Sequence, residues 1–319
     1  MFDRLVRLVG AGSAVVLSGA GISTESGIPD YRGPTGRARP AAPMTFGEFT
    51  SAPAARQRYW ARSFVGLPAI QRARPNAGHR SVARLQRAGL INGVITQNVD
   101  GLHQAAGSHP VIELHGSLER VRCLACAALS DRDELDARLQ EANPQLAALR
   151  AGLLVGGARE VAGEQAGDEP AGASVRPDGD VDLPTSLVES FRVVDCLDCG
   201  AGPLKPEVVF FGESVPAQRV AACYGMVDAA SVLLVLGSSL TVASGYRFVL
   251  RAVERGIPVA IVNQGSTRGD RHADCRVDAP LGATLTELVR RLDRDVADCA
   301  ADYAAVRQSG IHHGSSQFG

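Results

Sequence analysis

Short apolar runs alternate along this chain with longer stretches in which apolar residues recur every three or four positions. Several runs are apolar on successive residues, which is typical of parallel strands covered on both faces. The expected strands are Ala14–Leu17, Gly93–Thr96, Val111–Leu114, Val208–Phe211, Val232–Leu236, Val259–Val262 and Cys275–Val277. The expected helices between them are Ala77–Ala88, Ala217–Ala229, Tyr246–Arg255 and Leu285–Leu292. This alternation predicts an α/β fold built on a doubly wound, mostly parallel sheet.

Two segments interrupt the alternation and predict a second, smaller domain. Residues 33–75 begin as a loop rich in Pro, Gly and Arg and become helical over Ala54–Phe64, and residues 123–199 contain an expected helix, Asp131–Leu149. Residues 152–179 are rich in Gly, Ala, Glu and Asp, which predicts a flexible loop. We therefore expect a discontinuous Rossmann-like domain from residues 1–32, 76–122 and 200–300, a small domain from 33–75 and 123–199, and a disordered tail at 308–319.

Four of the seven cysteines form two Cys-x-x-Cys pairs, Cys123/Cys126 and Cys196/Cys199. This spacing lets both thiolates of a pair face one tetrahedral ion, and two pairs complete a structural zinc site with no open position. We therefore expect a zinc ribbon in the small domain. The pairs are much farther apart than the roughly 15 to 20 residues of a compact ribbon, which predicts an insertion inside the zinc module.

Two disulfides, or unrelated buried thiols, are the alternative interpretation of these cysteines. The first residues carry Asp3, Arg4 and Arg7 and no long apolar run, so we expect no secretory signal. A reducing, cytoplasmic compartment follows from that expectation and favours metal over disulfides. The other three cysteines lack partner spacing and are expected to be apolar fillers: Cys223, Cys275 and Cys299.

Length and charge exclude some classes of function. The chain has 319 residues, of which 45% are hydrophobic, so it can bury a substantial core. Its formal net charge of −1 gives no global field that would favour nucleic acid or an anionic membrane. No apolar run approaches the roughly 20 residues that span a bilayer. Lys205 is the only lysine, which indicates compositional bias toward arginine.

A glycine-rich loop follows the first expected strand and reads Ser18-Gly19-Ala20-Gly21-Ile22-Ser23. Glycines there let the backbone turn tightly and bring bare N–H groups against a pyrophosphate, at the start of a helix whose dipole favours anions. The next glycine is Gly27, so the GxGxxG pattern is absent and a plain tight turn remains an alternative.

Polar side chains also follow the other expected strands, at the edge where parallel sheets bind ligands. They are Gln97, Asn98, Asp100, His115, Glu213, Ser238, Ser239 and Asn263. Any single one, such as Asn98, could be only a helix N-cap, but together they predict a shared crevice. His115 alone has a pKa suited to proton transfer near neutral pH, although a purely structural histidine remains possible.

Several segments closely resemble the sirtuin family. They are Gly19–Arg32 (GAGISTESGIPDYR), Thr96–Asp100 (TQNVD), Glu113–Gly116 (ELHG), Pro206–Glu213 (PEVVFFGE) and Gly237–Leu240 (GSSL), with the cysteine pairs between them. Arg56–Arg62, Pro177–Val181 and Ser244–Phe248 resemble the class II branch that contains a weakly deacetylating mitochondrial sirtuin. The resemblance implies NAD-dependent removal of acyl groups from protein lysines, in which NAD is consumed and nicotinamide and O-acyl-ADP-ribose are released.

The resemblance also implies roles for individual residues. The catalytic set would be His115 as general base, with Asn98 and Asp100 holding the ribose and the nicotinamide carboxamide. The NAD-binding residues would be Gly19, Ala20, Gly21, Ser23, Asp30, Tyr31, Arg32, Gln97, Asn98, Val99, Asp100, Gly237, Ser238, Ser239, Asn263 and Gly265. The residues that bind the acylated lysine and its backbone would be Val209, Phe210, Gly212, Glu213 and Val242.

Two other functions remain compatible with the sequence: transfer of ADP-ribose to protein, and non-enzymatic NAD binding or interaction through the zinc module. The expected partners are acylated lysine side chains of proteins, not nucleic acid or membrane. The Tyr and Arg pair by which desuccinylating relatives hold an acidic acyl group is not evident, although Arg37 or Arg39 could serve. The acyl group, the target protein and the oligomeric state stay open.

Overall fold

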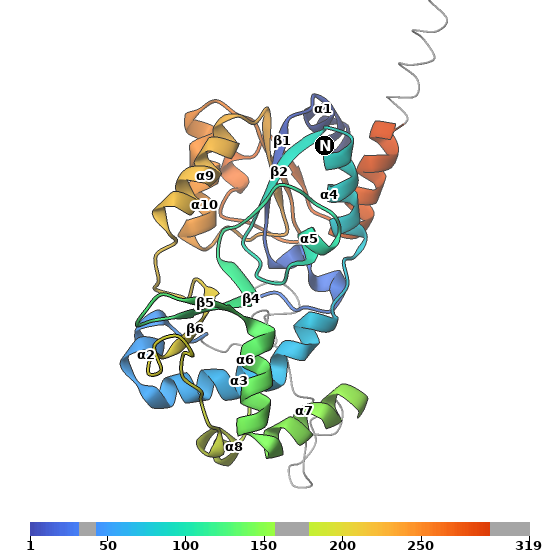
Figure 1. Ribbon diagram of the computed structural model, residues 1–319. Helices are drawn as coiled ribbons and strands as arrows, with labels where there is room; N and C mark the ends of the chain where they lie inside the picture. Colours follow the sequence, from blue (N-terminus) through green and yellow to red (C-terminus); the bar gives the residue numbers. More distant parts are fainter. Residues whose placement is uncertain (32–42, 157–178, 294–319) are drawn as a thin grey trace, which may run out of the picture.

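The computed structural model describes residues 1–31, 43–156 and 179–293, except the side chains of 152–156. Its larger sheet has six strands, all paired in parallel (Figure 1). Their order across the sheet is β3 (Val111–Glu113), β2 (Ile91–Thr96), β1 (Ala14–Ser18), β7 (Val232–Leu236), β8 (Val259–Val262) and β9 (Cys275–Val277). The doubly wound parallel sheet is therefore confirmed. Chain order reverses between β1 and β7, which is where such sheets open a ligand crevice.

Helices cover both faces of this sheet (Figure 1). One face carries α1 (Phe2–Gly10), α4 (Ala77–Arg87) and the helical stretch 281–293, and the other carries α9 (Ala217–Asp228) and α10 (Ala243–Glu254). Successive side chains of a strand point to opposite faces. On β1, Val16 packs in the first core while Val15 packs in the second.

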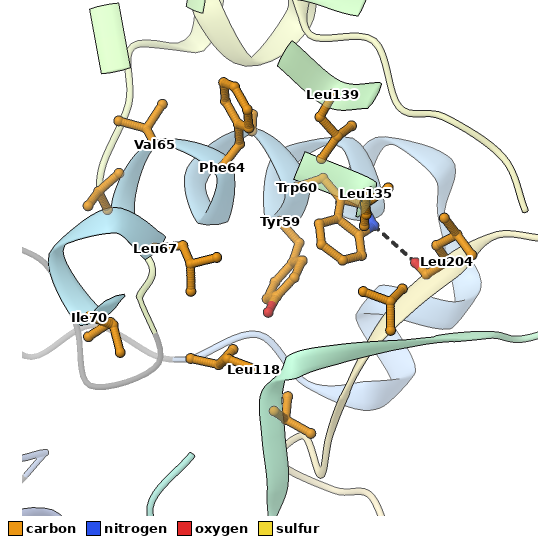
Figure 2. Close-up of a cluster of buried hydrophobic side chains, with 14 of the residues drawn as sticks. Tyr59, Trp60, Phe64, Val65, Leu67, Ile70, Leu118, Leu135, Leu139 and Leu204 are labelled. Atoms are coloured by element: carbon orange, nitrogen blue, oxygen red, sulfur yellow. Dashed lines mark hydrogen bonds between the residues drawn. The ribbon is translucent and has the colours of Figure 1, made fainter. Parts of the chain in front are cut away.

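The smaller sheet is antiparallel, with β4 (Gly116–Cys123) between β5 (Leu129–Asp131) and β6 (Leu204–Val208). It packs with α2 (Phe46–Ser51), α3 (Pro53–Arg72), α6 (Arg132–Ala142), α7 (Pro144–Gly156) and α8 (Thr185–Ser190) in the lower part of Figure 1. A shared apolar core binds these elements, and in it Trp60 Nε1 donates to the Leu204 carbonyl at 3.0 Å (Figure 2). Between the two sheets lie the short helix α5 (Leu102–Ala105) and the 3₁₀ turns Ala20–Ile22 and Thr24–Ser26.

Two expected elements were wrong. The strand expected at Val208–Phe211 is instead β6, which ends at Val208 and belongs to the antiparallel sheet. The single helix expected at Asp131–Leu149 is two helices, because Pro144 at the start of α7 disfavours helical backbone in the residue before it.

The structure also changes the expected segment boundaries. β4 and β6 place residues 116–122 and 204–208 in the small sheet, although the sequence assigned both to the large domain. Otherwise the division into domains stays a prediction. α7 continues to Gly156, so residues 152–156, which were expected to lie in a loop, are helical. Residues 157–178 and 308–319 lie outside the described part. No helix within the described ranges combines the length and the apolar character needed to cross a membrane.

Candidate active site

A cavity of about 1190 Å³ opens at the carboxyl ends of β1, β2 and β7. Every cofactor-site and substrate-site residue expected from the sequence lines it, except Arg32, which falls outside the described residues. His115, Asn98 and Asp100 line it as well. Residues distant in sequence are thus brought together where the order of strands reverses.

Three glycines let two loops pack against each other at this reversal. A Cβ on Gly21 would lie 2.8 Å from the Gly237 carbonyl, and a Cβ on Gly19 would lie 2.8 Å from Ser238 Cβ. Gly237 itself has φ +61°, a conformation that favours glycine. The N–H of Gly19 donates to Leu236 at 2.9 Å and that of Gly21 to Gly237 at 2.8 Å. These two N–H groups are therefore paired within the protein, and short 3₁₀ turns follow instead of the longer helix that was expected.

A chain of hydrogen bonds fixes the polar groups after β2. Ser23 Oγ donates to Asp100 Oδ2 at 2.6 Å, and Asn98 Nδ2 donates to Ser23 Oγ at 3.0 Å and to the Gly19 carbonyl at 3.2 Å. The other carboxylate oxygen of Asp100 accepts from the Leu102 N–H at 3.0 Å. Asp100 therefore also binds the first N–H of α5, while Asn98 ties the end of β2 to the glycine loop.

His115 is held through both ring nitrogens. Nδ1 lies 2.9 Å from the Gln97 carbonyl, which can only accept, so Nδ1 carries the proton. Nε2, 2.8 Å from Ser244 Oγ, is left with the basic lone pair. Burial lowers the pKa of His115, the bond to Gln97 opposes that shift, and the positive charge of Arg219 adds to it. The imidazole is therefore neutral at pH 7, with one nitrogen able to accept a proton.

The side chain of Gln97 connects His115 to the loop after β7. Its Nε2 donates to Ser238 Oγ at 2.8 Å. A Cβ on Gly245 would come within 2.6 Å of Gln97 Oε1, so glycine at the start of α10 leaves room for this amide. Contacts among the residues that follow β2 and β7 and the first turn of α10 thus fix the surroundings of the histidine.

The wall continues beyond β8, where Asn263 donates from Nδ2 to the carbonyls of Gln264 and Gly265 at 3.0 Å each. The Gly265 N–H in turn donates to Asp278 Oδ1 at 3.0 Å. Ser239 Oγ lies 3.0 Å from Thr241 Oγ1. These bonds fix the loops after β7, β8 and β9 where they line the cavity.

The loop after β6 forms the wall beside His115. The Val209 N–H donates to the His115 carbonyl at 2.7 Å. The carboxylate of Glu213 accepts from the Phe210 N–H at 2.8 Å and pairs with Lys205 Nζ at 3.0 Å. Lys205 is only 6% exposed, and its ammonium also lies 4.7 Å from the centre of the Phe210 ring. Burial lowers the pKa of Lys205, while Glu213 opposes that shift.

Comparison with known proteins identifies the family. The sequence model of the Sir2 family matches residues 19–244. The chain is 57% identical over 290 residues to NAD-dependent protein deacetylase 1 of Streptomyces coelicolor, covering 91% of this chain and 89% of that protein. The chain belongs to the Sir2 family. It is also 45% identical over 280 residues to NAD-dependent protein deacylase Sirt4 of Drosophila melanogaster, covering 86% of this chain and 82% of that protein, which fits the class II branch.

Solved Sir2 structures share the fold of this Sir2-family chain. A structure described as Sir2 with a p53 peptide and NAD⁺ aligns with a TM-score of 0.66 and 30% identity, covering 93% of this chain and 99% of that chain. A structure described as bearing on the mechanism and regulation of Sir2 enzymes aligns with a TM-score of 0.68 and 27% identity. The alignment covers 92% of this chain and 98% of that chain. The sirtuin resemblance found in the sequence is thereby confirmed.

The four paired cysteines of this Sir2-family chain form one cluster, with all Sγ atoms within 4.8 Å of one another. Cys123–Cys199 and Cys126–Cys196 are each separated by 3.7 Å between sulfurs. Tetrahedral zinc with bonds of 2.3 Å requires sulfurs about 3.8 Å apart, whereas a disulfide requires about 2.05 Å. The cluster therefore fits one structural zinc ion. A Cβ on Gly202 would lie 2.2 Å from Cys123 Sγ, so glycine is needed beside the cluster.

The remaining cysteines, and two residues that the sequence analysis missed, can also be compared with the structure. Cys223 and Cys275 are buried in the two cores of the large sheet, as expected, and Cys299 lies outside the described residues. Sequence reasoning missed the bond from Ser244 to His115 and the buried Lys205. A weak indication of each was present in the sequence. Ser244 stands two residues after Val242, an expected substrate-binding residue, and Lys205 is the only lysine of the chain.

Proposed function

We propose that this Sir2-family protein is an NAD-dependent protein-lysine deacylase. It consumes NAD and releases nicotinamide and O-acyl-ADP-ribose. The observation that carries the proposal is the neutral imidazole of His115, which shares one cavity with the Asp100–Ser23–Asn98 network. The names of the Streptomyces and Drosophila relatives support it. Neither of these two names refers to ADP-ribose transfer.

NAD would lie along the loops where the strand order reverses. The segment Gly19–Ser23 and the residues after β7 would contact the pyrophosphate, and Asn263 and Gly265 would contact the adenosine. Asp100 would hold the nicotinamide carboxamide, and Gln97 and Asn98 the ribose hydroxyls. Tyr31, whose ring lies 6.2 Å from that of Phe211 between centres, would help to shield the reacting carbon from water. These polar groups fit the cosubstrate because each is already held in place by hydrogen bonds.

His115 would perform the proton transfer. The acyl oxygen of the substrate would attack the ribose carbon that bears nicotinamide, and nicotinamide would leave. Nε2 of His115 would then accept a proton from a ribose hydroxyl, which frees the 2′-oxygen to attack the acyl carbon, still bonded to the lysine nitrogen. Addition of water would complete the release of the lysine amine and of O-acyl-ADP-ribose. Retaining the proton on Nδ1 requires the Gln97 carbonyl, which is already in contact. Ser244 must release Nε2 during this step, because its hydroxyl occupies the same lone pair in the structure.

The acylated protein segment would enter as an extended strand. Gly212 and Glu213 would flank one side and Val242–Gly245 the other, so that backbone groups pair as in β-strand addition. Val209 and Phe210 would line the channel for the acyl-lysine side chain. A cytoplasmic location suits the zinc cluster, because thiolate ligands persist in a reducing compartment.

Substitution of His115 tests the proposal. His115→Tyr should lower kcat for acyl removal about 10²- to 10⁴-fold, the usual contribution of a positioned base. NAD binding by calorimetry and the midpoint of thermal unfolding should stay near the wild-type values. His272→Gln is the matched control, because His272 does not line the cavity and bonds the Tyr246 hydroxyl instead. Full acyl removal by His115→Tyr would contradict the assigned base.

A further inference from the structure

We propose that Arg247 forms a subsite for an acidic side chain of the substrate protein, close to the acylated lysine. The inference rests on the proposed deacylase function and names a feature of its protein substrates. It concerns the part of the cavity that residues of α9 and α10 line. Backbone pairing alone reads little sequence, so a charged subsite there would set which proteins are preferred.

The first observation is the charge of the cavity wall. Among its described residues, Arg247 is the only arginine or lysine. The wall also carries five carboxylates, and bonds within the structure already hold several of them. They are Asp30, Asp100, Asp180, Glu213 and Asp278. Among the described residues of the wall, Arg247 is thus the one guanidinium, and the carboxylates outnumber it.

The second observation is that the Arg247 side chain has no ion pair or hydrogen bond with another described residue. Other arginines on α9 and α10 do have such partners. Arg219 contacts Glu207 at 3.9 Å, and Arg251 pairs with Asp228 at 2.8 Å. Arg247 is also only partly exposed. A half-buried guanidinium attracts a carboxylate more strongly than a fully exposed one, because water screens the charge less.

The third observation is the position of Arg247 on α10. It follows Ser244 by three residues, so both side chains lie on one helix face a turn apart. Ser244 contacts His115 Nε2 at 2.8 Å, so Arg247 lies one helical turn beyond the residue that contacts the proposed base. On the facing helix α9, Val220 and Tyr224 line the same cavity, also one turn apart. The Tyr224 and Phe248 rings pack at 5.3 Å between centres, which joins the two helices beneath this end of the cavity.

These features describe a groove with an apolar side and one cation. A strand held at Gly212–Glu213 and Val242–Gly245 would carry its flanking side chains past this groove. A carboxylate of Asp or Glu matches the planar guanidinium, because two parallel hydrogen bonds can form. A phosphate of NAD is the competing occupant, and it would show itself in the affinity for NAD.

Peptides that differ at one flanking position test the subsite. Each would carry the same acyl-lysine, with Ala, Glu or Lys placed at each of the two positions on either side. For at least one position, kcat/KM of the wild type should be about two- to fivefold higher for Glu than for Ala, as expected of a partly exposed charge pair. Arg247→Met should remove that preference, and Arg247→Glu should reverse it in favour of Lys. KM for NAD should not change in either variant.

Arg255→Met is the matched control, because it removes a guanidinium at the end of α10 that pairs with Asp228 and does not line the cavity. It should keep the wild-type preference. Equal preference in wild type and Arg247→Met would overturn the proposal, and so would a raised KM for NAD with an unchanged peptide preference. If the wild type removed no acyl group from any peptide, the proposed function would fail, and this inference with it.

Discussion

At the scale of single residues, two buried histidines lie beneath the strand ends that carry the site. The rings of His79 and His103 are 5.0 Å apart between centres, and His103 Nε2 lies 2.9 Å from Ser18 Oγ at the end of β1. Burial lowers the pKa of His79 to about 4 and that of His103 to about 3. Both rings are therefore neutral at pH 7, and protonating either would place a charge inside the core.

This pair predicts a loss of stability in mild acid. The unfolded chain takes up protons on both histidines near pH 6.5, whereas the folded protein does so only near pH 4 and pH 3. The unfolded state thus binds more protons below pH 6.5, so the free energy of unfolding should fall from pH 6.5 down toward those values. Denaturant unfolding at pH 7.5, 6 and 5 measures this slope.

The variant His79→Gln/His103→Gln provides the comparison. It should be less stable than the wild type at pH 7.5, but its free energy of unfolding should fall less between pH 7.5 and pH 5. Identical slopes for the two proteins would show that these histidines are not the groups responsible.

At the scale of elements, the sequence predicted the strands of the large sheet within a few residues, because they are buried on both faces and read as continuous apolar runs. The small sheet was harder. β4 exposes Glu119 and Arg120, so it has no such run. β6 contains Lys205 and Pro206, two residue types that are depleted in strands. Its apolar continuation, Val209–Phe211, is instead the loop that contacts His115.

The zinc cluster is the element that should hold the small sheet together. Cys123 ends β4, and the second pair precedes β6, so one ion would join the connections of two paired strands. Cys199→Ser should lower bound zinc well below one ion per chain and lower the thermal unfolding midpoint, because zinc binding contributes to folding free energy. Cys223→Ala, a buried cysteine outside the cluster, should keep one ion per chain. Full zinc occupancy in Cys199→Ser would contradict the assigned ligands.

At the scale of the whole molecule, the sequence predicted those site residues whose positions follow from the order of the parallel strands. Parallel strands end at one edge, so residues that follow them in sequence, such as Asn98 and Ser238, were expected to meet there. Ser244, Lys205 and Arg247 were not assigned roles, because their positions depend on how α10 and the β6 loop pack. Sequence pattern fixes which face of a helix is apolar, but not which side chain of that helix reaches a particular histidine.

The central claim is that NAD is consumed to remove acyl groups from protein lysines. The most direct test is mass spectrometry of the purified protein incubated with acetyl-, longer acyl-, succinyl- and lipoyl-lysine peptides, with and without NAD. The account predicts NAD-dependent loss of the acyl group from at least one peptide, with nicotinamide and O-acyl-ADP-ribose formed in equal amounts. Bound NAD and zinc without acyl loss from any peptide, or ADP-ribose attached to protein instead, would contradict it.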